Sequence, residues 1–328
     1  MTAPVKSAAS FRILSLDGGG IRGAFTAAVL ATIESLTGKR IVEHFDLIAG
    51  TSTGGIIAIA LGLGHSAQRI LDFYVQRGPD IFPSTGVHQR LWRRLRRCVR
   101  PKHDAAALEL ALTEILGNRL LGESACRLLI PAFDAVAGDV HVFKTAHDPR
   151  VLEDFQRRAV DVARATSAAP TYLPMYLSSW GQRFLDGGIW ANCPSTVAIL
   201  EATGVLGIPL ADIKLLSIGT TTPAYSVEKS AVGGGVVQYG FGASIIDLLL
   251  RAQAAAAWAQ TTLLTAHRAT RIDCTVKPGQ FSLDDARALT SLVGHGKQRG
   301  RHLSAQIGKE FLDEAVVPFV PCSPAAAG

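Results

Sequence analysis

Residues 45–61 read FDLIAGTSTGGIIAIAL, and this stretch decides the fold. An apolar strand over residues 46–49 is expected to turn directly into an apolar helix over residues 56–63, with Ser52 at the turn between Gly50 and Gly54. A turn this sharp strains the backbone of its central residue, and the flanking glycines let the strand and the helix pass closely. The pattern predicts a nucleophile elbow, which presents the Ser52 hydroxyl at a helix N-terminus, where negative charge is favoured.

The chain has 328 residues, of which 48% are hydrophobic, so it can fill a sizeable globular core. Its longest apolar stretches fall short of the roughly 18 residues that a transmembrane helix needs. The first residues, MTAPVKSAASFR, lack the apolar centre of a signal peptide. We therefore expect a cytoplasmic protein that acts on a membrane, if at all, from its surface.

The cysteines and the charge distribution argue against disulfides, a metal site and nucleic acid binding. The five cysteines are scattered and never form a C-x-x-C pair, so neither a disulfide framework nor a zinc site is indicated, and no metal or cofactor is expected. The formal net charge is +6, but residues 90–102 alone hold seven Lys or Arg and no acid. The basic character is therefore local, and a nucleic acid polymer is not an expected partner.

A second glycine-rich turn precedes the elbow. Residues 12–16 are expected to form a buried strand, followed by the loop DGGGIRG over residues 17–23 and a helix over residues 24–36. The loop matches the dinucleotide pattern G-x-G-x-x-G, but that site needs an acid at the end of the second strand, where this chain has Ala-Gly-Thr. An oxyanion hole made of glycine amides is the favoured interpretation. A nucleotide-binding protein that uses the same loop remains the alternative.

Patterns along the rest of the chain alternate between strands and helices. Helices are expected over 68–83, 105–121, 244–268 and 284–315, with another ending at Pro170, and strands over 128–133, 140–145, 182–185, 214–220 and 271–275. No stretch is a convincing domain boundary, although a glycine-rich segment covers residues 232–242. The prediction is one α/β domain over residues 1–328, in three layers, with a mainly parallel sheet and helices on both faces.

Residues 88–103, HQRLWRRLRRCVRPKH, are predicted to form a short basic amphipathic helix, because Leu91, Leu95 and Val99 recur at helical spacing beneath the arginines. Such a helix can simply pack one stripe on the core and expose the other to water. It can also attract anionic lipid headgroups, or form part of a pocket for a phosphorylated activator. The sequence leaves these three interpretations open.

Four stretches together resemble the patatin-like phospholipase family in its bacterial form. They are DGGGIRG at 17–23, GTSTG at 50–54, ATSAAPTYLP at 165–174, and DGG at 186–188 followed by IWANCPS. Their order and spacing cover most of residues 12–220, the motif-bearing core. The remaining residues, including a helical part over 240–316, carry no motif of the family.

The resemblance implies a catalytic dyad without histidine, in which Ser52 is the nucleophile and Asp186 the base. It also implies an oxyanion hole and supporting glycines. The predicted oxyanion residues are Gly18, Gly19, Gly20, Arg22 and Thr53, and the predicted supporting residues are Gly50, Gly54, Gly187 and Gly188. The chain departs from the family at residues 192–194, which are Asn-Cys-Pro where Asn-Asn-Pro is usual. This departure affects the loop that supports the aspartate.

The activity implied by the resemblance is that of a phospholipase A type lipid acyl hydrolase, which cleaves membrane phospholipid esters through an acyl-enzyme. Some family members are effectors of bacterial antiphage defence that a cyclic nucleotide switches on, and the GPDIFP stretch at 78–83 is similar to that subgroup. The expected partners are therefore phospholipid at a membrane surface, a cyclic nucleotide activator and further copies of the chain. Two alternatives stay open: an inert binding module, and an esterase whose triad uses His267, His295 or His302.

Overall fold

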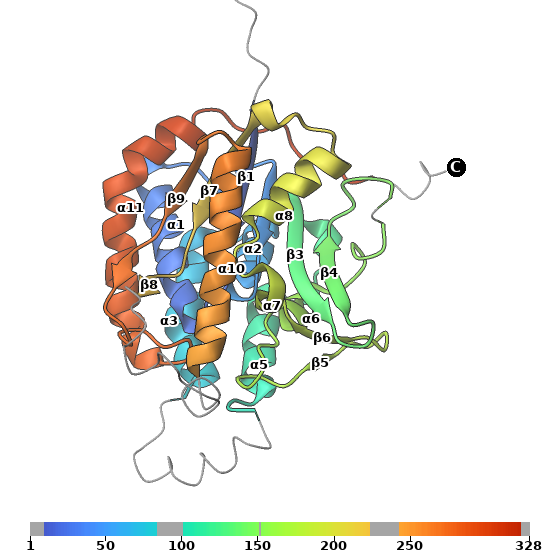
Figure 1. Cartoon of the computed structure of the whole chain (residues 1–328), viewed down its shortest axis with the longest axis vertical. Helices are drawn as coiled ribbons and strands as arrows, with labels where there is room; N and C mark the ends of the chain where they lie inside the picture. Colours follow the sequence, from blue (N-terminus) through green and yellow to red (C-terminus); the bar gives the residue numbers. More distant parts are fainter. Residues whose placement is uncertain (1–9, 84–100, 151, 224–242, 323–328) are drawn as a thin grey trace, which may run out of the picture.

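The structure is a computed structural model and describes residues 10–83, 101–150, 152–223 and 243–322. Its central feature is a twisted sheet in which the strands lie in the order β5-β6-β3-β2-β1-β7-β9, with β4 paired to β3 (Figure 1). The parallel strands are β1 (Phe11–Leu16), β2 (Leu47–Gly50), β3 (Arg127–Asp134), β7 (Ile213–Ile218) and β9 (Ala269–Ile272). The antiparallel strands are β4 (Asp139–Lys144), β5 (Tyr176–Leu177) and β6 (Arg183–Asp186).

Helices cover both faces of this sheet. One face packs on α1 (Gly23–Thr37), α2 (Thr53–Gly62), α3 (Ala67–Ile81), α5 (Ala105–Leu116), α6 (Ala159–Thr166) and α11 (Leu289–Phe311). The other face packs on α8 (Ser195–Leu200) and α10 (Ala243–Leu264), which Figure 1 shows lying over the strands. Strand side chains alternate between the two faces, as in β1, where Ile13 faces α8 and α10 while Leu14 faces α1. The predicted three-layer α/β class with a mainly parallel sheet is confirmed.

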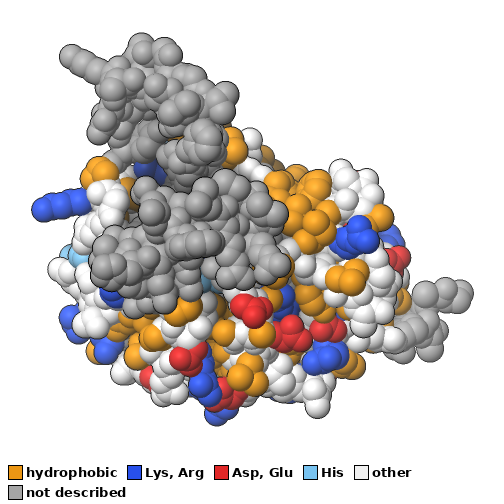
Figure 2. Space-filling model, turned by 90° about the horizontal axis from the view of Figure 1, so that it is seen from below, with side chains coloured by type: hydrophobic (Ala, Val, Ile, Leu, Met, Phe, Trp, Pro, Cys, Tyr) orange, Lys and Arg blue, Asp and Glu red, His pale blue; other side chains and the backbone are white. Residues whose placement is uncertain are grey.

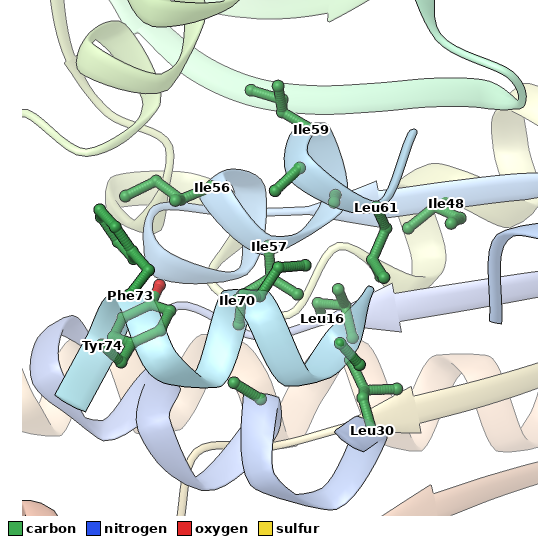
Figure 3. Packing of buried hydrophobic residues seen from close by; sticks show 14 of the residues in the cluster. Leu16, Leu30, Ile48, Ile56, Ile57, Ile59, Leu61, Ile70, Phe73 and Tyr74 are labelled. Atoms are coloured by element: carbon green, nitrogen blue, oxygen red, sulfur yellow. The ribbon is translucent and has the colours of Figure 1, made fainter. Parts of the chain in front are cut away.

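Helix α2 lies in the middle of the first layer and is buried along its whole length. Figure 3 shows Ile57 of α2 packed against Ile70 of α3, with Leu16 of β1 and Leu30 of α1 nearby. A helix that is apolar on all sides can be stable only when it is enclosed in this way. The elbow therefore leads into a helix that is buried along its whole length.

The C-terminal helix α11 is fastened to the first strand and the first helix. Gly296 lies so close to the Phe25 carbonyl oxygen of α1 that a Cβ atom would overlap it, which lets the two helices approach closely. At the other end of α11, the buried guanidinium of Arg12 donates to the carbonyl oxygen of Phe311 at 2.8 Å and to that of Glu314 at 2.5 Å. These carbonyls would otherwise lack partners at the helix end, so the cation caps α11.

Several boundaries differ from the sequence prediction for local reasons. The helix expected over 105–121 ends at Leu116, because Gly117 adopts a φ of 61° that breaks it. The helix expected to run to Pro170 ends at Thr166. The late strand expected over 271–275 is divided into β9 and β10 (Thr275–Val276), which pairs with β8 (Thr222–Pro223). Most of the basic helix over 88–103 and the glycine-rich segment over 232–242 lie outside the described residues. In the described ranges no helix is long and apolar enough to cross a membrane.

Candidate active site

Ser52 occupies a strained turn between β2 and α2. Its φ of 55° and ψ of −121° place a non-glycine residue in a conformation that costs on the order of 1–3 kcal/mol. A Cβ atom at Gly50 would overlap the Gly54 carbonyl oxygen, and one at Gly54 would overlap the Leu16 carbonyl oxygen. The Ser52 N–H donates to Thr166 Oγ1 at 3.0 Å, which secures the turn from a neighbouring helix. The local geometry is that of the predicted elbow.

The structure places Asp186 directly beside the Ser52 hydroxyl. Ser52 Oγ donates to Asp186 Oδ2 at 2.7 Å, across a separation of 134 residues in the chain. The second carboxylate oxygen, Oδ1, accepts from the Gly188 N–H at 2.7 Å. Asp186 ends β6, and the next turn is held tight because Gly187 packs against the Pro131 carbonyl oxygen of β3. The carboxylate is therefore fixed on both oxygens, with one of them aimed at the hydroxyl.

Burial controls the charge of this carboxylate. Desolvation raises the pKa of Asp186 to about 6, even though the hydrogen bonds from Ser52 and Gly188 favour the ionised form. Only 6% of the Asp186 surface and 9% of the Ser52 surface are exposed. A carboxylate of raised pKa accepts a proton more readily than an ordinary aspartate, for which the pKa is about 3.9. The site therefore improves Asp186 as a base near neutral pH.

The glycine loop that follows β1 lies next to Ser52 and Asp186. Its N–H groups differ in whether they are free to bind an oxyanion. The Gly18 N–H donates to the Asn192 carbonyl oxygen at 2.9 Å, and the Arg22 N–H donates to the Gly19 carbonyl oxygen at 3.1 Å. These two predicted oxyanion amides are therefore engaged within the protein. The N–H groups of Gly19 and Gly20 have no acceptor among the described residues. Thr53, the first residue of α2, presents its N–H at the helix N-terminus.

The first turn of α2 is also anchored by α3, which the sequence motifs did not indicate. The hydroxyls of Thr53 and Tyr74 share a hydrogen bond, and Tyr74 Oη donates to the Thr53 carbonyl oxygen at 3.1 Å. Burial raises the pKa of Tyr74, so this phenol stays neutral. Figure 3 shows the Tyr74 ring reaching from α3 toward the start of α2. Tyr74 thus positions Thr53, one of the remaining oxyanion candidates.

A mainly apolar cavity of about 210 Å³ opens at the dyad. Ser52, Asp186, Gly19 and Gly20 form part of its wall. Most of the remaining wall is hydrophobic and includes Ile56, Phe73, Ile81, Leu108, Leu173 and Leu249. An acyl chain bound in this cavity would place its ester carbonyl next to the hydroxyl and the free glycine amides.

The three histidines considered for a triad lie elsewhere. His267, His295 and His302 are not among the described residues that line the Ser52 cavity. His295 instead contacts Phe281 and lies with its Nδ1 atom 3.9 Å from Cys274 Sγ. The geometry therefore favours the aspartate over a histidine as the partner of Ser52. The described residues also contain no cluster of His, Cys, Asp or Glu suited to a metal ion.

An ion pair between Arg271 and Asp17 holds the first residue of the glycine loop. Arg271 of β9 donates to Asp17 Oδ2 at 2.6 Å, to Ser217 Oγ at 2.7 Å and to Asp273 Oδ2 at 3.0 Å. Cys193, which departs from the usual Asn-Asn-Pro stretch, is buried with its Sγ atom 3.7 Å from the Arg271 guanidinium. Desolvation raises the pKa of the Cys193 thiol to about 11, so it stays protonated. The departure therefore lies next to the ion pair, and the dyad does not contact it.

Comparison with known proteins identifies the family over the residues that carry the site. Residues 14–199 match the family described as Patatin-like phospholipase. The chain belongs to this family. A relative from Pseudomonas aeruginosa, named cGAMP-activated phospholipase, is 36% identical over 249 residues, covering 74% of this chain and 72% of the relative. A protein of the same name from Vibrio cholerae is 34% identical over 317 residues, covering 88% of this chain and 89% of the relative. Among solved structures, VipD from Legionella pneumophila gives a TM-score of 0.45 at 11% identity, over 91% of this chain and 67% of VipD.

Proposed function

We propose that this patatin-like protein hydrolyses phospholipid esters through Ser52 and Asp186 and is switched on by a cyclic nucleotide. The observation that carries the proposed chemistry is the 2.7 Å hydrogen bond from Ser52 Oγ to Asp186 Oδ2, formed in a strained elbow at the end of an apolar cavity. As a member of its family, the chain is a lipid ester hydrolase. The assignment of roles to individual residues rests on the geometry.

In the acylation step, Ser52 Oγ attacks the ester carbonyl while its proton passes to Asp186 Oδ2. The carbonyl oxygen becomes negatively charged and is bound by the N–H groups of Gly19, Gly20 and Thr53, where removing one donor would cost about 3 kcal/mol. Asp186 then returns the proton to the departing alcohol oxygen of the lipid. The ester C–O bond breaks, and the acyl group remains on Ser52.

In the deacylation step, water attacks the acyl carbonyl and Asp186 accepts the proton of that water. Collapse of the second tetrahedral intermediate breaks the bond to Ser52 Oγ, which recovers the proton from Asp186. One carboxylate therefore serves both steps. Its orientation is kept throughout by the Gly188 N–H, which binds the oxygen that does not transfer protons.

Peripheral action on a membrane is supported by hydrophobic side chains at the surface. Ile189 and Leu249 line the Ser52 cavity and are themselves 37% and 55% exposed, and Met175 and Leu177 are also exposed. Figure 2 shows hydrophobic side chains interspersed with charged ones on the face seen from below. An amphipathic surface beside the cavity would let a lipid pass from a bilayer to Ser52.

Activation by a cyclic nucleotide is supported by the relatives from Pseudomonas aeruginosa and Vibrio cholerae, both named cGAMP-activated phospholipases. The Vibrio cholerae match extends over most of both chains, beyond the residues that carry the family motifs. We also propose a role in antiviral defence, where a nucleotide signal triggers membrane phospholipid breakdown, because the GPDIFP stretch at 78–83 is similar to the antiphage subgroup of the family.

The test is fatty acid release from phospholipid vesicles by the wild type and Ser52→Ala, with and without cGAMP. Release by the wild type should rise when cGAMP is added, and Ser52→Ala should release none in either condition. Ser304→Ala is a matched control that should behave as the wild type, because the Ser304 hydroxyl bonds only to the Arg301 carbonyl oxygen of its own helix α11 among the described residues. Equal release with and without cGAMP would rule out the proposed switch, and release by Ser52→Ala would rule out the nucleophile.

A further inference from the structure

A second cavity, of about 550 Å³, adjoins the Ser52 cavity and shares the lining residues Tyr172, Asn192 and Leu250 with it. Its volume falls within the range of roughly 300–1,000 Å³ that ligand pockets take. It is formed by residues 220–223 after β7, the end of β9, the middle of α10 and the segment after β10. Its walls differ from those of the Ser52 cavity, because they include the charged residues Arg22, Arg251, Arg271, Asp17 and Asp273.

The charge of this second cavity favours an anion. Asp17 and Asp273 both pair with Arg271, so their negative charge is partly compensated within the wall. Arg22 and Arg251 add positive charge from two other directions, α10 supplying Arg251 and the glycine loop supplying Arg22. Guanidinium groups bind phosphate oxygens through paired, charge-assisted hydrogen bonds. A ligand with phosphodiester groups would therefore complement these walls.

The same cavity also offers aromatic surface. The half-buried Trp258 lies about two helical turns after Arg251 on the same face of α10, and Phe281 comes from the segment after β10. Aromatic side chains next to guanidinium groups bind flat nucleobases by stacking, at roughly 1–3 kcal/mol for each base. The combination of cationic and aromatic walls is suited to a nucleotide, whereas the Ser52 cavity is suited to an acyl chain.

The wall of the second cavity includes Thr221, three residues after β7, whose hydroxyl lacks a hydrogen-bond partner among the described residues. Thr221 has a φ of 80°, which is strained for a β-branched residue. Only 4% of Thr221 is exposed, and its Oγ1 atom has no hydrogen-bond partner among the described residues. An unpaired buried hydroxyl costs about 1–3 kcal/mol. A polar ligand that contacts this segment can offset that cost, which gives a second indication of a ligand site.

We infer that this second cavity binds the activating cyclic dinucleotide, with Arg22 and Arg251 on its phosphates and Trp258 against a purine base. The inference rests on the proposed function, because it assigns a place to the proposed activator. A cyclic dinucleotide carries two phosphodiester charges and two bases, so it uses both kinds of wall at once. A neutral lipid has neither the phosphate charges nor the bases, so it would match neither kind of wall.

The position of the cavity explains how its ligand can reach the catalytic groups. Arg22 lines the second cavity, and its Nε atom donates to the Gly19 carbonyl oxygen at 3.3 Å. Asn192 lines both cavities, and its carbonyl oxygen accepts from the Gly18 N–H. A phosphate that draws the Arg22 guanidinium toward itself would therefore shift the loop that carries the Gly19 and Gly20 amides. Binding in one cavity would set the oxyanion donors in the other.

Calorimetric titration of the full chain with cGAMP tests this assignment without relying on catalysis. The proteins compared are the wild type, Arg251→Met, Trp258→Leu and the control Arg287→Met, whose guanidinium pairs with Asp285 at the surface. Loss of one arginine–phosphate contact should weaken binding by at least roughly tenfold. Trp258→Leu should weaken it by a similar factor, whereas Arg287→Met should bind as the wild type does. Circular dichroism establishes which variants are folded, and either cavity variant suffices for the test.

The outcomes distinguish an error in the assigned binding site from an error in the proposed activation. If the wild type binds cGAMP and the two cavity variants bind it more weakly, the site is established even where cGAMP fails to raise lipid hydrolysis, which would refute only the proposed activation. If the wild type does not bind cGAMP, or if folded cavity variants bind it as tightly as the control, the assignment is wrong. A raised KM for phospholipid in Arg251→Met, with an unchanged Kd for cGAMP, would assign the cavity to the lipid headgroup and would also overturn it.

Discussion

Replacing Asp186 by asparagine should stabilise the fold while it removes the activity. Asparagine has the same shape, so its Oδ1 atom can accept from the Gly188 N–H, and its amide can donate to Ser52 Oγ in place of the present hydrogen bond. What is lost is a buried negative charge whose only described partners are these two neutral groups. Burial of such a charge is a cost that the functional site imposes on the fold.

The size of the effect follows from the pKa of Asp186, which is raised from 3.8 to about 6 in the folded protein. A group whose folded pKa exceeds its unfolded pKa binds its proton more tightly in the folded state, so stability falls as the pH rises between the two values. Asparagine removes this penalty. The gain should be small near pH 4, about 1.5 kcal/mol at pH 5, and at most about 3 kcal/mol above pH 7.

The assay is urea unfolding of the wild type and Asp186→Asn at pH 5 and pH 8, followed by circular dichroism. The difference between the two proteins in the free energy of unfolding, extrapolated to zero urea, gives the gain directly. Asp186→Ala is the matched control, because it removes the charge but leaves the Gly188 N–H without its acceptor. An asparagine variant that is less stable than the wild type at pH 8, or a gain that does not grow with pH, would refute the account of the buried carboxylate.

Three further predictions follow from the same contacts. The kcat/KM for a soluble ester should fall tenfold for each pH unit below about pH 6, because Asp186 becomes protonated there; a flat profile down to pH 5 would contradict its role as the base. Gly54→Ala should lose roughly 3 kcal/mol or more in urea unfolding because its Cβ would overlap the Leu16 carbonyl oxygen, whereas Gly204→Ala, which has open space around it, should stay near the wild type. His295→Ala should keep its esterase activity within about twofold, and a hundredfold loss would revive the histidine triad.

The elbow, the glycine loop and the aspartate turn could all be located from the sequence, because each needs particular residue types over a few positions. Gly50 and Gly54 illustrate this, since a Cβ at either would overlap backbone. The α/β class followed from the alternation of apolar strands and helices. Pairing Ser52 with Asp186 required the family resemblance, because spacing along the chain carries no information about two groups 134 residues apart.

Other features depended on contacts that a sequence pattern does not encode. The engagement of the Gly18 amide by Asn192 removes it from the expected oxyanion donors, and the motif treats all three glycines alike. Tyr74 carries no motif of its own, yet it anchors Thr53 from a different helix. Helix ends were misplaced where a single backbone angle decided them, as at Gly117. Each of these features depends on tertiary contacts or local backbone geometry.

The central claim is that an aspartate, without histidine, activates Ser52. The most direct measurement is the rate of fatty acid release from phospholipid vesicles by Asp186→Asn in the presence of cGAMP, with the unfolding experiments above showing that the variant is folded. The account predicts a loss of at least about a hundredfold relative to the wild type, since asparagine cannot accept the serine proton. Activity within a few fold of the wild type would contradict the Ser52–Asp186 dyad.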